Sequence, residues 1–163
     1  NSTLGHQGIN AIGSGTFTVE NSTIYGRSLI NLRSDYGSTW QGEFFIRNCV
    51  FVPAGGKPVS ASLIGGSYSG QHNFGYTCYM PDRITIENLR IDDSKHPEGY
   101  RGPAIFGNIN SKMTDDSYVE KFPYVITREV ILRNVTIASG KELRVSDNPF
   151  MFRDVKVTTI NDE

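Results

Sequence analysis

One short pattern recurs along this chain and limits its fold more than any other feature of the sequence. In each copy, apolar residues alternate with other residues, an asparagine follows, and a large apolar residue comes three positions later. The copies are Phe17–Ile24, Phe44–Phe51, Ile84–Ile91 and Val130–Ile137, then Phe150–Val157 with Asp154 in place of asparagine, and the partial copy Asn1–Leu4. An internal repeat indicates an array of stacked units, none of which can bury its apolar face alone.

The spacing within the copies distinguishes strands from helices. Helical repeats keep a nearly constant period and place apolar residues every three or four positions. Here the marker residues are separated by 20 to 46 positions, and the apolar residues lie two and four positions before the asparagine. That spacing is typical of a strand with one buried face, so we expect strands that stack repeat on repeat.

The residue just before the asparagine alternates in charge, being Glu20, Arg47, Glu87 and Arg133 in turn. At the ~4.8 Å spacing of neighbouring strands, this column would pair opposite charges and help to fix the register. Asparagine tolerates the left-handed backbone of a sharp bend, and its repetition would form a buried amide ladder. The sequence therefore predicts an all-β parallel β-helix of about five coils, each with three strands.

This strand–asparagine–strand pattern resembles the right-handed parallel β-helices of the pectate-lyase-like superfamily over the whole chain. The resemblance implies a right-handed solenoid, a fold that hosts lyases, hydrolases, esterases, phage tailspikes and adhesins, so it does not by itself imply one activity. Family signatures do not carry over, because the chain has no Asp-Gly-x-Asp run. The segment Ala104–Asn108 is only a faint echo of an esterase-like Asp-Phe-Ile-Phe-Gly run and lacks its aspartate.

Composition and termini bound the remaining possibilities. Residues 1–163 are expected to form one domain, and a net charge of −1 gives no basis for binding nucleic acid or a membrane. No apolar run reaches the ~20 residues of a membrane span. Cys49 and Cys78 are expected to be buried free thiols, with a single disulfide as the alternative. Because Asn1 lies inside a repeat, we expect a segment of a longer β-helix, whose remaining coils would be its partners.

Long insertions between the repeats are expected to carry function. Those that follow the third strand of a coil span 34–43, 65–83 and 107–129, and a second family precedes it at 53–60 and 92–103. If the coils superpose, the two families would wall an elongated groove, a shape that suits a polymer. In pectate-lyase-like enzymes the site lies in such a groove, so the resemblance implies a site here.

The densest polar patch lies at the start of the first insertion and supplies most of the predicted site. Asn31 and Arg33 are expected to face outward from a strand, and Arg33 could bind a uronate carboxylate with two parallel hydrogen bonds. Asp35 and Tyr36 follow as acid–base candidates, and Trp40 could stack on a sugar ring. The alternative is a structural Arg33–Asp35 pair with Trp40 packed under its own loop.

The next insertions on the same edge add further candidates. A lyase needs a base to remove the proton beside a uronate carboxylate and an acid for the leaving oxygen, and His72 could serve as either. Tyr68 and Tyr76 are expected to bind substrate. Asn108, Asn110 and Lys112 would extend the substrate contacts by one coil. His72 as a solvent-exposed loop histidine is the alternative, and His6 and His96 are weaker candidates.

Two other kinds of motif are expected to have no functional role. The pairs Asp92–Asp93 and Asp115–Asp116 match no calcium-loop pattern, so we expect solvated turn charges, no metal site and no cofactor. Asn1, Asn21 and Asn134 each begin an Asn-x-Ser/Thr glycosylation motif. As members of a buried ladder, they are not expected to accept a glycan.

Together these features predict a carbohydrate-active protein. The favoured function is a polysaccharide lyase, or a hydrolase, that acts on an acidic glycan in a groove along the β-helix. The alternative is a non-catalytic glycan-binding adhesin or tailspike segment, in which the same aromatic residues only bind. Either function places the protein outside the cell, at the cell surface or in the periplasm.

Overall fold

The computed structural model describes residues 1–4, 9–33, 40–53, 61–67, 76–116 and 124–162, and every element whose bounds it describes is a β-strand. The strands are β1 (Ser2–Leu4), β2 (Ile9–Ala11), β3 (Gly13–Glu20), β4 (Ser22–Gly26), β5 (Ser28–Leu32), β6 (Trp40–Pro53), β7 (Ala61–Gly66), β8 (Cys78–Tyr79), β9 (Arg83–Ile91), β10 (Pro103–Phe106), β11 (Tyr124–Val125), β12 (Glu129–Ile137), β13 (Arg144–Ser146) and β14 (Lys156–Ile160). Within these ranges, no helix is long and apolar enough to cross a membrane.

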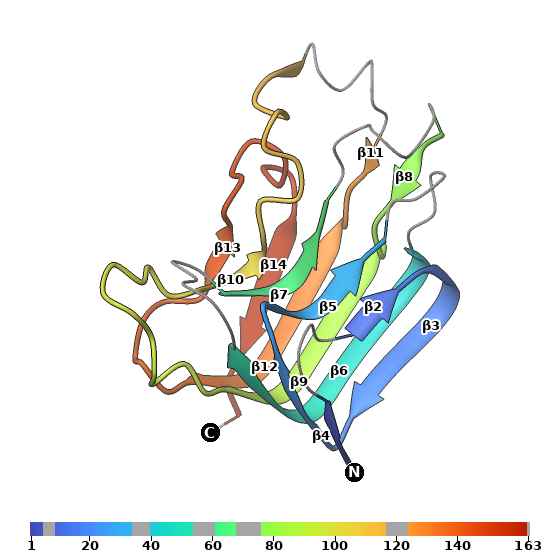
Figure 1. Ribbon diagram of the computed structural model, residues 1–163. Helices are drawn as coiled ribbons and strands as arrows, with labels where there is room; N and C mark the ends of the chain where they lie inside the picture. The colour runs from blue at the N-terminus through green and yellow to red at the C-terminus, as the bar shows by residue number, and fades with distance from the viewer. Residues whose placement is uncertain (5–8, 34–39, 54–60, 68–75, 117–123, 163) are drawn as a thin grey trace.

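The strands form two main parallel sheets that face each other (Figure 1). The large sheet has the order β1-β4-β6-β9-β12-β14, with β3 also paired to β6, and contains the asparagine pattern. The small sheet has the order β13-β10-β7-β5-β2 and contains the expected third strands, while β8 and β11 make a separate pair. Successive repeats therefore pair in parallel, an arrangement that is compatible with a β-helix.

The register of the large sheet aligns the asparagine motifs. Glu20 pairs with Arg47, Arg47 with Glu87, and Glu87 with Arg133, so the predicted alternating column of charge is confirmed. Within it, Arg47 lies 2.7 Å from the Glu20 carboxylate, whereas Arg133 is 3.9 Å from that of Glu87. These side chains are substantially exposed, so the column contributes mainly to register and little to stability.

The asparagine forms a corner at which the alternation of buried and exposed side chains along the strand is interrupted and starts again. In β6, Phe44 and Ile46 are buried, Arg47 and Asn48 are both exposed, and Cys49 is buried again. Asn48 has a φ of 52°, and Asn21, Asn88 and Asn134 have φ of 51° or 52°. This left-handed residue turns two successive side chains outward, which returns the next residue to the core.

The ladder forms, but on the outside of the molecule. Asn88 donates from Nδ2 to Oδ1 of Asn48 at 3.0 Å, and Asn134 donates to Asn88 at 3.2 Å. The expectation of a buried ladder is wrong, because Asn21, Asn48 and Asn88 are exposed and Asn134 is half-buried. The outward turn at the corner explains the difference.

The expected fifth copy, Phe150–Val157, does not form a corner of the large sheet, so this prediction is wrong. Residues 149–154 form turns in which Phe152 stacks on Phe106 with ring centres 4.3 Å apart. The strand that joins the large sheet is β14, whose Ile160 pairs with Arg133, so Asn161 follows at the marker position instead of Asp154. Asp162 then bonds Asn134 through its backbone N–H and its carboxylate.

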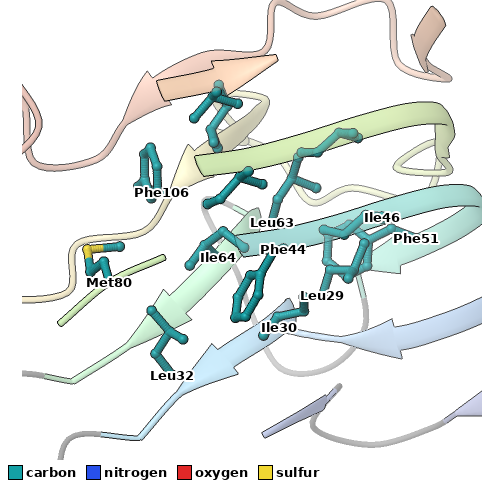
Figure 2. Packing of buried hydrophobic residues seen from close by; sticks show 14 of the residues in the cluster. Leu29, Ile30, Leu32, Phe44, Ile46, Phe51, Leu63, Ile64, Met80 and Phe106 are labelled. Carbon is teal, nitrogen blue, oxygen red and sulfur yellow. The ribbon is translucent and has the colours of Figure 1, made fainter. Parts of the chain in front are cut away.

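The core lies between the two main sheets. Figure 2 shows Phe44, Ile46 and Phe51 of β6 close to Leu29 and Ile30 of β5. All five side chains are fully buried. Cys49 and Cys78 are buried free thiols, as expected. Burial raises the pKa of the Cys49 thiol, which keeps it protonated and weakly reactive at neutral pH.

Candidate functional site

A hollow of about 480 Å³ opens where the strands of the large sheet end and the chain crosses to the small sheet. Its volume lies in the range of small-molecule sites. We call it the Tyr25 pocket. Its lining residues are Tyr25, Val52, Pro53, Asp92, Asp93, Ser94, Lys95, His96, Pro97 and Tyr100.

The elements that line this pocket are joined by connections of unequal length. Only Arg27 separates β4 from β5, whereas residues 92–102 separate β9 from β10. Val52 is the register partner of Tyr25, and the backbone N–H of Asp92 donates to the carbonyl of Phe51 at 2.8 Å. The pocket is therefore lined by residues of three successive repeats.

A buried carboxylate anchors the longer segment. Asp93 is only 3% exposed and accepts hydrogen bonds from the backbone N–H and the hydroxyl of Ser139, both at 2.7 Å. It also accepts one from the Tyr100 hydroxyl at 2.9 Å. The expectation that Asp93 is a solvated turn charge is therefore wrong. Burial, together with the hydrogen bond to Asp93 and its charge, raises the pKa of Tyr100 well above the usual range.

Aromatic rings form two sides of the pocket. His96 stacks on Tyr100 with ring centres 4.9 Å apart and planes inclined by 22°. The Nδ1 atom of His96 lies 3.1 Å from the carbonyl oxygen of Pro97. Tyr25 is 38% exposed and lines the same hollow from an earlier repeat. Rings of this kind offer flat, polarisable faces whose polar ends can also form hydrogen bonds.

Charged groups of both signs border these rings. Lys95 is exposed, and the Asp92 carboxylate accepts a hydrogen bond from the Ser94 hydroxyl at 2.9 Å. A ligand in the pocket would thus meet a cation for a carboxylate and an acceptor for a hydroxyl group. Among the described residues, no group of three His, Cys, Asp or Glu side chains could hold a metal ion.

Several predicted site residues lie elsewhere or outside the described ranges. Asp35, Tyr36, Tyr68 and His72 belong to segments that the structure does not describe. Arg33 is exposed just after β5, where its backbone N–H donates to the carbonyl of Ala11 at 3.1 Å. Asn31 donates from Nδ2 to Oδ1 of Asn10 at 3.0 Å. The roles predicted for these residues stay predictions.

Trp40 is engaged in the core instead of facing a groove. It is the first residue of β6, so the expected insertion 34–43 ends before it. Its indole N–H donates to the carbonyl of Gly15 at 2.9 Å, and its ring lies 5.2 Å from Phe17 and 5.5 Å from Phe44. These contacts favour the structural alternative for Trp40 over the sugar platform.

The candidates of the last insertion divide into buried and exposed residues. Asn110 is 2% exposed, donates to the Tyr124 hydroxyl and accepts from the backbone N–H of Lys112. It holds its own segment in place, so its amide is not presented to a substrate. Asn108 and Lys112 are exposed, as is Tyr76 of the preceding insertion, and the substrate contacts expected of all three stay predictions.

Sequence reasoning did not bring the Tyr25 pocket together. The sequence pattern singles out no role for Tyr25, and it makes His96, in the second family of insertions, only a weaker candidate. The available signal was the eleven-residue connection after β9, compared with the single residue that connects β4 to β5 two repeats earlier.

Comparison of the chain with protein-family models, with curated proteins and with solved structures finds no match.

Proposed function

We propose that this chain is a right-handed parallel β-helix of the pectate-lyase-like kind and that it binds an acidic polysaccharide in the Tyr25 pocket. The supporting observation is the pocket's composition: an exposed tyrosine and a stacked histidine–tyrosine pair border the same hollow as Lys95 and Asp92. The parallel sheets and the asparagine corners support the fold part of the proposal. Its site of action would be outside the cell, at the cell surface or in the periplasm.

The pocket suits a saccharide because a sugar ring has an apolar C–H face and a polar edge. An aromatic face can cover the first, while Asp92 and Lys95 can bond hydroxyl and carboxylate groups at the second. The pocket also extends over three repeats, so a chain of sugar units could lie along the stacking direction. The net charge of the chain, −1, does not attract an acidic ligand. The exposed Lys95 is therefore the group that would bind the carboxylate of the ligand.

A binding assay with paired ligands tests this proposal. We expect the protein to bind polygalacturonate more tightly than its fully methyl-esterified form, measured by isothermal titration calorimetry. Tyr25→Ala should weaken binding about tenfold, which corresponds to about 1.4 kcal/mol. Lys95→Ala should reduce the preference for the charged polymer, because it removes the cation but leaves the aromatic faces.

Tyr76→Ala is the matched control, because Tyr76 is an exposed tyrosine outside the pocket. Unchanged affinity in Tyr25→Ala together with loss in Tyr76→Ala would move the binding site to the other edge. Absence of binding to either polymer, in protein with a cooperative unfolding transition, would overturn the glycan-binding proposal.

Catalysis is the second candidate, and the exposed Arg33 beside the Asn10–Asn31 amide pair favours it. In a lyase, Arg33 would neutralise the uronate carboxylate while Tyr36 or His72 exchanged protons with the substrate. Incubation with polygalacturonate should then produce an unsaturated uronate, which absorbs in the ultraviolet, and Arg33→Ala and His72→Ala should abolish that product. Binding without product would favour the adhesin or tailspike alternative, and product that survives both substitutions would exclude this site.

A further inference from the structure

The motif Asn21-Ser22-Thr23 lies on the exterior of the molecule. Asn21 forms the first described asparagine corner, has a φ of 51° and is exposed. Its backbone N–H donates to the carbonyl of Arg47 at 3.2 Å, so the neighbouring repeat holds the backbone while the residue stays exposed. The burial that argued against glycosylation at this asparagine is therefore absent.

The Asn21 side chain also stands outside the ladder. The side-chain hydrogen bonds run from Asn134 to Asn88 and from Asn88 to Asn48, where they stop. Among the described residues, the amide of Asn21 has no hydrogen-bond partner. Its Nδ2 atom is thus not committed to holding the fold together.

Space for a substituent lies next to this amide. An open hollow of about 500 Å³ adjoins the asparagine corners of the first repeats. Its lining residues are Asn1, Ser2, Thr3, Asn21, Ser22, Thr23, Asn48 and Val50. The hollow therefore leaves room beside Asn21 for the first sugar of a glycan.

Asn134 begins the same kind of motif in a different environment. Its Nδ2 atom donates to Oδ1 of Asn88 at 3.2 Å and to Oδ2 of Asp162 at 2.9 Å. Its Oδ1 accepts from the backbone N–H of Asp162 at 3.1 Å. A glycan would replace one of the two hydrogens on this nitrogen, so the bond to Asn88 or the bond to Asp162 would be lost. The two motifs therefore make a contrasting pair within one chain.

We propose that Asn21 is an acceptor for an N-linked glycan and that Asn134 is not. In the transfer, Nδ2 of Asn21 attacks C1 of the first sugar on a lipid-linked diphosphate donor. The C1–O bond breaks, the lipid diphosphate leaves with the electron pair, and Nδ2 loses one proton as the C1–N bond forms. Thr23 supplies the hydroxyl that the acceptor motif requires. This inference is independent of the ligand of the Tyr25 pocket.

The test secretes the full chain from a eukaryotic host as variants that each keep one motif. Thr3→Ala with Thr136→Ala leaves only the Asn21 motif, and Thr3→Ala with Thr23→Ala leaves only the Asn134 motif, so both asparagines stay in place. We expect the intact mass of the first variant to show a glycan that peptide N-glycanase removes, converting Asn21 to aspartate. The second variant should have the mass of the bare chain.

Peptide mapping of the unmodified sequence from the same host provides the second measurement. The folded, protease-resistant fraction should carry glycan at Asn21 in most molecules and none at Asn134. A bare Asn21 in that fraction, or equal occupancy of Asn134, would overturn the proposal. The unfolding midpoint of the Asn21-glycosylated protein should also match that of the enzymatically deglycosylated protein, since no native contact is lost.

Discussion

At the scale of single residues, the marker asparagines account for the sharp corners of the large sheet and for the row of amide groups on its exterior. A left-handed backbone costs most residues about 1–2 kcal/mol, and asparagine is one of the few that adopts it routinely. The four positive-φ residues other than glycine in the described part of the chain are all marker asparagines. The side chains of Asn48, Asn88 and Asn134 then reach one another because the corners stack in register.

Asn88 offers the sharpest test of this role because it both donates and accepts within the ladder. Asn88→Ala should lower the free energy of unfolding by about 2–3 kcal/mol, combining backbone strain with two lost hydrogen bonds in an exposed setting. Asn88→Gly removes the same hydrogen bonds but tolerates the backbone, so its loss should be clearly smaller. Urea denaturation of both variants measures the difference, and equal losses would show that the left-handed backbone contributes nothing.

At the scale of elements, hydrogen bonds between polar groups hold the segment 92–102 in place, whereas apolar packing holds the strands. Asp93 joins the start of the segment to Ser139 of the next repeat and to Tyr100 near its end. The wall of the Tyr25 pocket is therefore fixed to the scaffold at both ends. This attachment keeps His96 and Lys95 beside Tyr25 in the absence of any regular structure between them.

The Tyr100–Asp93 contact should appear in the alkaline stability of the protein. An unfolded tyrosine loses its proton near pH 10, whereas burial and Asp93 raise the pKa of Tyr100 above that value in the folded state. The folded state therefore binds more protons above about pH 10, and the stability from this group falls as pH rises from there. Below that pH the contribution is complete.

Tyr100→Phe should remove this part of the alkaline decline. It should also lower the free energy of unfolding at neutral pH by about 1–2 kcal/mol, because the Asp93 carboxylate loses a buried donor. Unfolding by urea at pH 7 and at pH 11 measures both effects, with the exposed Tyr25→Phe as the control that should retain the decline. An unchanged alkaline decline in Tyr100→Phe would contradict the assignment.

At the scale of the whole molecule, the sequence was sufficient to predict the parallel sheets but insufficient to predict the Tyr25 pocket. The marker asparagines predicted which residues stack on which, because a period of two and a positive-φ residue are local properties. Asp154 was misplaced for a non-local reason, since Phe152 packs on Phe106 far away in the chain. The Tyr25 pocket is non-local as well, because it depends on how three repeats superpose.

The asparagine corner also has a consequence for how such a chain can evolve. Each corner sets which side chains of the following strand face the core, so this alternation is fixed separately in every repeat. The chain between Asn88 and Asn134 is longer than that between Asn21 and Asn48 by 19 residues, yet all four asparagines stay aligned. Insertions and deletions between corners therefore do not shift the register of the sheets. The loops around a pocket can change in length during evolution while the sheets beneath them stay the same.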